Sequence, residues 1–482
     1  MFEAYDKKAF WKSLGGIVLM MVLMKTTGGA GFALIALFSL GAVLLGRTTQ
    51  MLFGLMLANV ALMGNGWFFP RGFVFGLAHR GMLVVIGFCL AARVFGGSRK
   101  MVLAPLMLIF PFLMYMLIPS LQGWAPVVSL LKLLLFSLVF IAYAGAAKMA
   151  LSSSEGRIRE YRAMVVATLA FFILGSVAIA PFPSISYMGA EELANDAAFL
   201  ADLEAGRIVS LFKGMTWHSQ SLGPLISVFC LFLLGDMLFN INKPDKLYLA
   251  MIAICPILVY KTSSRTAMAV LICGILIMLI LFQGSHTIRG SWKSKVMSIS
   301  TILGVLMFVA VATIPDARQG MVNYALKYSN DDHAKFSTEE MMATRQALID
   351  RAIYNWRKKP LIGNGFQVSD EMQYEHRKGF ADYLSAPIEK GVWISAVLEE
   401  GGVIGLSLFC FFWITAFFSL WAGRFYGTAS LLLSLVIMNM AEFTIFSMSG
   451  IGGFIWCLVF MMAILEGWRV DSERIGYGLM PA

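Results

Sequence analysis

The sequence predicts an all-α polytopic membrane protein with about 14 transmembrane helices. Composition is the first reason. Hydrophobic residues make up 59% of the chain and charged residues only 14%, and the mean hydropathy is +0.76. The second reason is a series of apolar runs, most of them long enough for a helix to cross a bilayer. The expected spans lie near 10–24, 31–46, 50–65, 73–96, 101–118, 126–147, 163–181, 221–240, 247–260, 266–283, 296–314, 391–421, 428–446 and 452–467.

Basic residues between the apolar runs predict the orientation. Lys and Arg are enriched in the cytoplasmic loops of membrane proteins. In this chain they fall mainly on one side of the expected topology, and both termini lie on that side. We therefore expect that side to be cytoplasmic. The residues are Arg47, Arg93, Arg99, Lys100, Lys148, Arg157, Arg159, Arg162, Lys243, Lys246, Arg289, Lys293, Lys295 and Arg469.

One long polar segment interrupts the apolar pattern. It carries eleven Lys or Arg and eleven Asp or Glu, so the net charge of +10 comes from the rest of the chain. That excess reflects orientation and contact with anionic lipid, and we expect no binding to nucleic acid. The predicted organisation is N-terminal spans in 1–162, central spans in 163–314 with an outward loop at 181–219, a large, partly helical extracytoplasmic loop at 315–390, and C-terminal spans in 391–482.

Cysteines and acidic runs give no sign of a metal centre. All six cysteines lie in apolar segments, which argues against a disulfide framework and against a thiolate metal site. Asp331, Asp332 and His333 have the composition of a metal site, but consecutive acids in a polar run are typical of a solvated surface. We expect neither a metal nor a cofactor.

The large loop contains a predicted helix. Ser337 followed by Glu340 is a capping-box pattern, and the helix should run to about Lys358, because Pro360 cannot continue it. Three- and four-residue spacing places a set of side chains on one face of this helix. The set is Arg345, Ile349, Ala352, Ile353 and Trp356.

Two arginines are candidate phosphate ligands. On the apolar face of its helix, Arg345 needs an anion, which is either a lipid phosphate bound through two hydrogen bonds or a nearby acid. Arg265 lies at the outer end of a span between Ser264 and Thr266, whose hydroxyls suit phosphate oxygens. The alternative for Arg265 is a side chain that reaches the interface and anchors the helix end.

Further polar residues lie near the same membrane face. His218, between Lys213 and the next span, is either a proton shuttle or glycan ligand, or a structural interfacial residue. Glu442, in the outer half of its span, is placed to orient Arg265 or an acceptor. For Glu399 and Glu400 we expect a role in the fold.

Four motifs in order resemble a known family. Residues 218–223 read His-Ser-Gln-Ser-Leu-Gly, 263–267 read Ser-Ser-Arg-Thr-Ala, 360–365 read Pro-Leu-Ile-Gly-Asn-Gly and 399–405 read Glu-Glu-Gly-Gly-Val-Ile-Gly. With Arg345, they resemble the O-antigen ligase and polymerase superfamily of lipid-linked glycan transferases with a GT-C-type membrane fold. The resemblance covers about residues 200 to 420.

The resemblance implies a metal-independent glycosyltransferase of the bacterial inner membrane, with its active site facing the periplasm. Its substrate would be an undecaprenyl-diphosphate-linked oligosaccharide. By motif match, Arg345 and Arg265 would hold the diphosphate leaving group. As the base we expect Glu389 at the membrane boundary, where desolvation raises the pKa of a carboxyl group and Lys390 opposes that rise. The remaining candidates are His376 and His218 as alternative bases, and Lys213, His218, Gln220, His376 and Glu442 as substrate-binding residues.

The acceptor separates two enzymes in this superfamily. Its ligases carry His-Asn just before the last motif, whereas this chain has Glu389, Lys390 and Gly391 there. The missing histidine favours a polymerase for repeat units of an exopolysaccharide or O-antigen. The alternatives are an O-antigen ligase that transfers glycan to lipid A core, a transporter for the same lipid-linked sugar, and an assembly scaffold. A chain-length regulator protein is a further expected partner.

Overall fold

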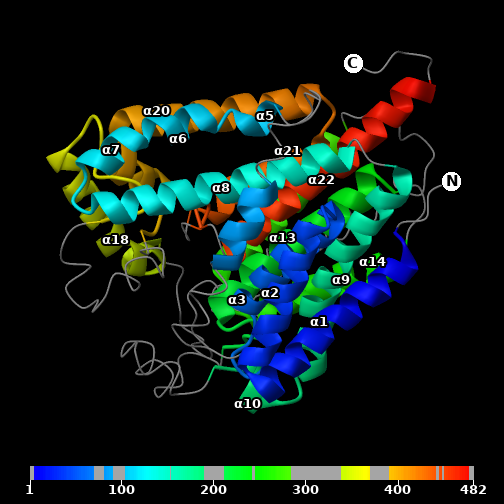
Figure 1. The fold of residues 1–482 in the computed structure, drawn as a ribbon. Coiled ribbons are helices and arrows are strands. Elements are labelled where there is room, and N and C mark those ends of the chain that lie inside the picture. Colours follow the sequence, from blue (N-terminus) through cyan, green and yellow to red (C-terminus); the bar gives the residue numbers. More distant parts are fainter. Residues whose placement is uncertain are drawn as a thin grey trace, which may run out of the picture.

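The computed structural model of the chain is a bundle of helices (Figure 1). In the residues that it describes, β-structure amounts to two isolated bridges, which join Gly64 to Thr216 and Tyr187 to Phe212. The predicted all-α class is therefore confirmed. The described residues are 5–69, 81–90, 104–151, 154–188, 211–241, 245–283, 338–369, 390–440, 444–447 and 450–476.

The helices follow the apolar runs of the sequence, with caps and turns between them. They are α1 (Lys7–Thr27), α2 (Gly29–Leu44), α3 (Thr48–Met63), α5 (Ala104–Met107), α6 (Phe110–Tyr115), α7 (Leu117–Gln122), α8 (Pro126–Leu151), α9 (Glu155–Ile179), α10 (Pro183–Ser186), α13 (Ser219–Phe239), α14 (Lys246–Lys261), α15 (Arg265–Gln283), α18 (Thr338–Lys358), α20 (Trp393–Ala422), α21 (Tyr426–Met438) and α22 (Gly450–Gly476).

Among the described residues, eight helical segments are long and apolar enough to cross a membrane, and four further apolar helices are shorter. The predicted span at 296–314 and most of that at 73–96 lie outside these residues, so the total of about 14 remains a prediction. The eight segments are Lys7–Thr27, Pro105–Gln122, Pro126–Lys148, Glu155–Ile179, Ser219–Phe239, Arg265–Phe282, Trp393–Ala422 and Gly450–Val470.

Prolines divide one of these segments. Pro105–Gln122 consists of the short helices α5, α6 and α7, and Pro111 and Pro119 lie within the second and third. A proline lacks the N–H that would continue the helical ladder, and its ring clashes with the preceding turn. The segment therefore crosses as three short pieces beside α8 and α20 (Figure 1).

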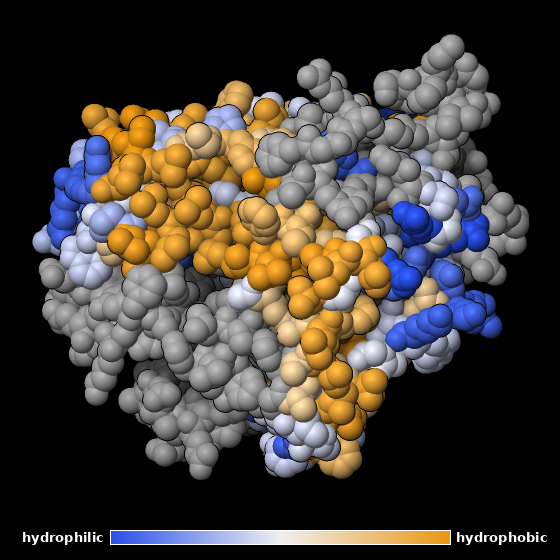
Figure 2. All heavy atoms as spheres, in the orientation of Figure 1, coloured by the Kyte–Doolittle hydropathy of each residue, from blue (hydrophilic) through white to orange (hydrophobic). Residues whose placement is uncertain are grey.

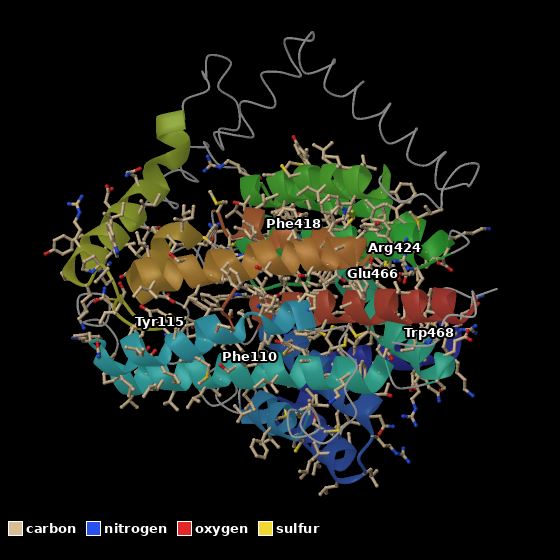
Figure 3. All side chains as sticks on the ribbon, turned by 90° about the horizontal axis from the view of Figure 1, so that it is seen from above. Phe110, Tyr115, Phe418, Arg424, Glu466 and Trp468 are labelled. Carbon is tan, nitrogen blue, oxygen red and sulfur yellow. The ribbon has the colours of Figure 1, made fainter. Side chains whose placement is uncertain are left out.

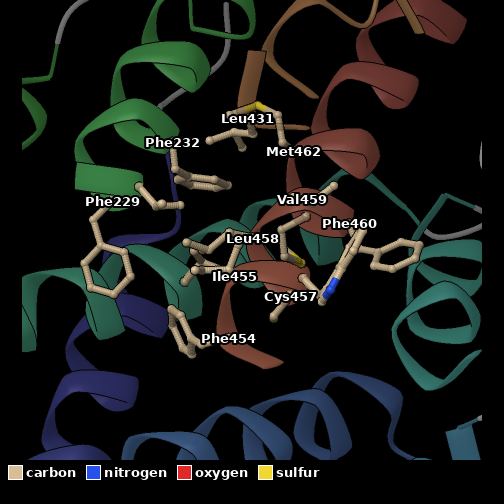
Figure 4. Close-up of a cluster of buried hydrophobic side chains, with 14 of the residues drawn as sticks. Phe229, Phe232, Leu431, Phe454, Ile455, Cys457, Leu458, Val459, Phe460 and Met462 are labelled. Atoms are coloured by element: carbon tan, nitrogen blue, oxygen red, sulfur yellow. The ribbon is translucent and has the colours of Figure 1, made fainter. Parts of the chain in front are cut away.

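Helices α13 and α22 form the centre of the bundle. The whole apolar window of α13 and 89% of that of α22 are buried. Figure 4 shows side chains of both helices meeting in one apolar cluster, in which the rings of Phe229 and Phe454 lie 5.5 Å apart. Burial of apolar side chains and contacts between aromatic rings stabilise this centre.

The surface agrees with insertion in a membrane. Apolar side chains cover the middle of the face seen in Figure 2, and hydrophilic ones gather at its edges. Large apolar side chains are well exposed on the outer helices, among them Leu44 and Ile280. A lipid environment accounts for such exposure, since the hydrocarbon core of a bilayer is itself apolar.

One end of the bundle, which we call the basic end, is held by buried charges. Helices α1 and α9 begin there, and α13, α20 and α22 end there (Figure 1). Arg469 donates to the carbonyl oxygens of Phe239 (3.1 Å) and Arg424 (2.8 Å), which end α13 and follow α20. Arg162 Nε lies 3.2 Å from Asp236 Oδ2. Cations at helix C-termini complement the helix dipole, so these contacts stabilise the helix ends.

The opposite end carries the described candidate residues. In Figure 3, Tyr115 lies far along the bundle from Glu466 and Trp468, which mark the basic end. The start of α13, the turn between α14 and α15, α18 and the start of α20 belong to this opposite end. Because helices alternate in direction, residues from distant parts of the sequence meet here.

Candidate active site

The loop at 360–365 docks on a break in α20. Gly402 has φ 64° and ψ −167°, which interrupts the helix one turn after its charged pair. The two hydrogen bonds that a regular helix would make from residues 403 and 404 back to 399 and 400 are replaced by bonds to the loop. These bonds are Val403 N to Pro360 O (3.0 Å), Ile404 N to Leu361 O (3.3 Å), Asn364 N to Glu399 O (2.9 Å) and Gly365 N to Glu400 O (2.9 Å).

Glycines make this close contact possible. A Cβ atom on Gly402 would lie 2.2 Å from the carbonyl oxygen of Leu361, and one on Gly363 would lie 2.4 Å from that of Glu400. Both glycines also have positive φ, which other residues rarely adopt. The motifs at 360–365 and 399–405 are therefore two halves of one interface.

Three charged side chains meet beneath the loop. Lys390 Nζ lies 3.0 Å from Glu399 Oε2 and 3.0 Å from Glu400 Oε1, and it donates to the carbonyl oxygen of Val368 at 2.7 Å. Each of these charged residues is at most 3% exposed. Gly391, with φ 70°, turns the chain between Lys390 and α20. The ammonium thus lies against both carboxyl groups.

Glu399 also joins three other parts of the chain. Its Oε1 accepts from Asn355 Nδ2 of α18 and from Ser369 Oγ, each at 2.8 Å. Buried carboxylates are costly unless they are paired and hydrogen-bonded, so these contacts are required by the burial itself. We call Lys390, Glu399, Glu400, Asn355 and Ser369 the Lys390 cluster.

The neighbouring carboxyl groups keep Lys390 protonated. Burial alone lowers the pKa of the ammonium group, but the negative charges of Glu399 and Glu400 outweigh burial and raise that pKa above its usual value. Lys390 is therefore a cation at neutral pH and cannot serve as a base. Its charge faces Glu399 and Glu400. The expected effect of Lys390 on Glu389 stays a prediction, because Glu389 lies outside the described residues.

Helix α18 has the predicted end, and its buried face includes one residue that the spacing did not indicate. It ends at Lys358, as expected, and packs on α20. Ala352 and Asn355 are both 2% exposed, whereas Trp356 is only half-buried. Position 345 lies seven residues before Ala352 and so shares its face by helical register. The side chain of Arg345 lies outside the described residues.

Arg265 is the first residue of α15 and is half-buried. Ser264 precedes it, and its Oγ accepts from the N–H of Ala267 at 3.3 Å, which caps the helix. A Cβ on Gly223 of α13 would lie 2.7 Å from both Ser264 Cβ and Thr262 Oγ1. The fold therefore brings the motif at the start of α13 against the Arg265 turn.

His218 begins α13. Its Nδ1 accepts from the backbone N–H of Gln220 at 3.1 Å, so the side chain caps the helix. In a neutral ring this bond leaves the proton on Nε2, which then cannot accept a second proton. The geometry supports a structural part for His218. Lys213 is buried, and the side chain of Gln220 is exposed.

The other candidates cannot be placed. Glu389, His376 and Glu442 lie outside the described residues, and their roles remain predictions. In the part of the chain that is described, no group of three or more His, Cys, Asp or Glu is arranged to hold a metal ion.

The sequence itself carries one signal for the Lys390 cluster. A lysine next to an apolar run that contains two acids needs a partner, because charges at such depth are costly. Lys390 with Glu399 and Glu400 fits that description. Asn355 had no such signal, because an asparagine on a polar helix is usually solvated.

The fold and this arrangement define a polytopic helical membrane protein with polar motifs gathered at one end. Residues 249–410 match the family described as O-antigen ligase. The match runs from α14 to the first part of α20 and includes Arg265, the docked loop and the Glu399–Glu400 pair. The match supports the resemblance to the O-antigen ligase and polymerase superfamily that the motifs predict. A search of curated proteins finds no match.

Proposed function

We propose that this protein is a bacterial inner-membrane glycosyltransferase that polymerises undecaprenyl-diphosphate-linked oligosaccharide repeat units at the periplasmic face. The product would be an exopolysaccharide or O-antigen. The observation that carries the proposal is the family match at residues 249–410, which contains the Arg265 turn and both halves of the docked interface.

The reaction would be a displacement at the anomeric carbon. The acceptor hydroxyl oxygen forms a bond to C1 of the donor sugar, and the bond from C1 to the diphosphate oxygen breaks. The leaving lipid diphosphate takes the electron pair, and the hydroxyl proton passes to a base. Cations near the leaving group stabilise the charge that builds on it.

The residues have distinct parts in this reaction. Arg265 supports binding of the diphosphate, because the N-terminus of α15 adds a partial positive charge to that of the guanidinium. Arg345 would contribute the second cation and Glu389 the base. The cap that His218 makes on α13 and the charged state of Lys390 support the choice of Glu389 over these two residues as the base.

A ligase is the second candidate, because the matched family is described as O-antigen ligase. It would use the same donor and transfer the glycan to lipid A core. The sequence just before α20 argues against a ligase. The superfamily's ligases carry a histidine there, whereas this chain has Lys390. The acceptor therefore decides between the two.

The test uses purified protein in lipid, undecaprenyl-diphosphate-linked repeat units and EDTA, with products separated on a gel. A ladder of longer glycans supports a metal-independent polymerase. Transfer only after addition of lipid A core would support the ligase, and no transfer to either acceptor would overturn both.

Two variants test the assigned residues in the same assay. Glu389→Gln and Arg265→Gln should each lower kcat by roughly 100-fold or more, because they remove a base and a charge that stabilises the transition state. The matched control is Arg157→Gln, an exposed arginine at the basic end, which should retain wild-type activity. Wild-type output from Glu389→Gln would show that another group is the base.

A further inference from the structure

The Lys390 cluster contains the residues on both sides of residues 370–389, which belong to the large loop predicted at 315–390. Lys390 Nζ donates to the carbonyl oxygen of Val368 at 2.7 Å, and Ser369 Oγ donates to Glu399 at 2.8 Å. The chain therefore leaves the cluster after Ser369 and returns to it at Lys390. Both attachment points of residues 370–389 contact Glu399 on α20, and Lys390 also contacts Glu400.

We propose that Lys390, Glu399 and Ser369 are positioning residues for the proposed glycosyl transfer. They fix the two attachment points relative to α20 and the docked loop. The inference rests on the proposed function, in which Glu389, the residue before Lys390, is the base. None of the three positioning residues is assigned a contact with the substrate.

The electrostatic cost of the cluster supports a positional role. Two carboxyl groups share one ammonium group, and all three are almost completely buried. Buried ion pairs repay little of their desolvation cost, and well-packed apolar residues often stabilise a fold as well or better. What charges add is direction, because each hydrogen bond fixes a distance and an angle.

The contacts on Glu399 show this directional character. One of its oxygens accepts from Asn355 and Ser369, and the other lies against Lys390. Its backbone oxygen accepts from the N–H of Asn364. A single residue, Glu399, therefore contacts helix α18, the docked loop and both attachment points. A small displacement of groups that must align for the reaction lowers the rate steeply. Precise positioning of these segments can therefore outweigh the desolvation cost of the buried charges.

Removal of all three charges together gives the first test. The variant Lys390→Met, Glu399→Gln, Glu400→Gln keeps similar side-chain sizes and leaves no charge unpaired. We expect a melting temperature close to that of the wild type, a kcat lower by roughly 100-fold and a KM within about twofold. A kcat equal to that of the wild type would overturn the inference.

Ser369→Ala is the second test, because it removes one bond without leaving a charge and should fold even if the triple variant does not. We expect a kcat lower by roughly tenfold with an unchanged KM. An unchanged kcat in this variant would also overturn the inference.

The matched control is the buried pair at the basic end, changed to Arg162→Met, Asp236→Asn. It removes an ion pair of similar burial, and we expect it to alter the melting temperature but not kcat. A loss of kcat equal to that of the triple variant would show a general effect of buried charge and would overturn the inference.

The two proposals fail in different ways. If the wild type extends glycans and the cluster variants do so equally well, only the positioning role is wrong. If the wild type transfers to neither acceptor, the proposed function is wrong and the positioning role falls with it.

Discussion

Replacement of Gly402 by alanine tests whether the docked loop is as close to α20 as described. The added Cβ would lie 2.2 Å from the carbonyl oxygen of Leu361, so the loop would have to withdraw by about 1 Å to reach an ordinary contact. The backbone at φ 64°, ψ −167° is accessible essentially only to glycine, and holding alanine there costs about 1–3 kcal/mol. Loss of two of the four loop hydrogen bonds adds roughly 1 kcal/mol each. Together the change should destabilise the fold by about 3–5 kcal/mol.

Thermal unfolding of the purified protein in detergent measures this effect, and the glycosyl-transfer assay reports on the site. We expect Gly402→Ala to melt several degrees below the wild type and to lose most of its activity. The control is Gly15→Ala in α1, where no atom lies within 4 Å of the added Cβ and the change should stabilise the helix by up to about 1 kcal/mol. A Gly402→Ala protein with the wild-type melting temperature would refute the description of this interface.

Two further predictions concern buried charges. Since the folded-state pKa of Lys390 is raised, its ion pairs contribute stability that is complete below the unfolded pKa of about 10.4 and is lost as pH rises through the higher folded value. Relative to the variant Lys390→Met, Glu399→Gln, Glu400→Gln, which leaves no charge unpaired, the wild-type melting temperature should hold steady from about pH 7 to 9 and fall only above about pH 10.4; a fall near neutral pH would contradict the assignment. At the basic end, Glu466 accepts from the N–H groups of Gly427 (2.7 Å) and Thr428 (2.9 Å) at the start of α21. Glu466→Ala should lower the stability of the fold by about 2–4 kcal/mol and leave KM unchanged. Glu466→Gln, which keeps one acceptor oxygen, should lower it less. Equal melting temperatures of the two variants would argue against the cap.

Local pattern was sufficient to predict several elements. The end of α18 at Lys358 follows from Pro360 two residues later. The apolar runs gave most of the described spans, and the four motifs gave the superfamily that the match at residues 249–410 supports. These features depend on neighbours in the sequence, which the chain itself displays.

The break in α20 was harder to predict. The sequence shows Gly401 and Gly402 in a run long enough to span, and a continuous helix is the default for such a run. Only the docked loop, which supplies replacement bonds to the backbone on both sides of Gly402, makes the break stable. The partner of a broken helix lies elsewhere in the chain, so local pattern cannot reveal it.

The sequence by itself determined that this protein is helical, spans a membrane and carries motifs similar to those of the O-antigen ligase and polymerase superfamily, because composition, periodicity and motifs are properties of short stretches of chain. Tertiary structure alone decided that Lys390 pairs with Glu399 and Glu400, that Asn355 is buried against them, and that His218 caps a helix. The physical reason is that a buried charge or polar group is stable only beside a specific partner, and the packing of helices far apart in the sequence decides which partner is within reach.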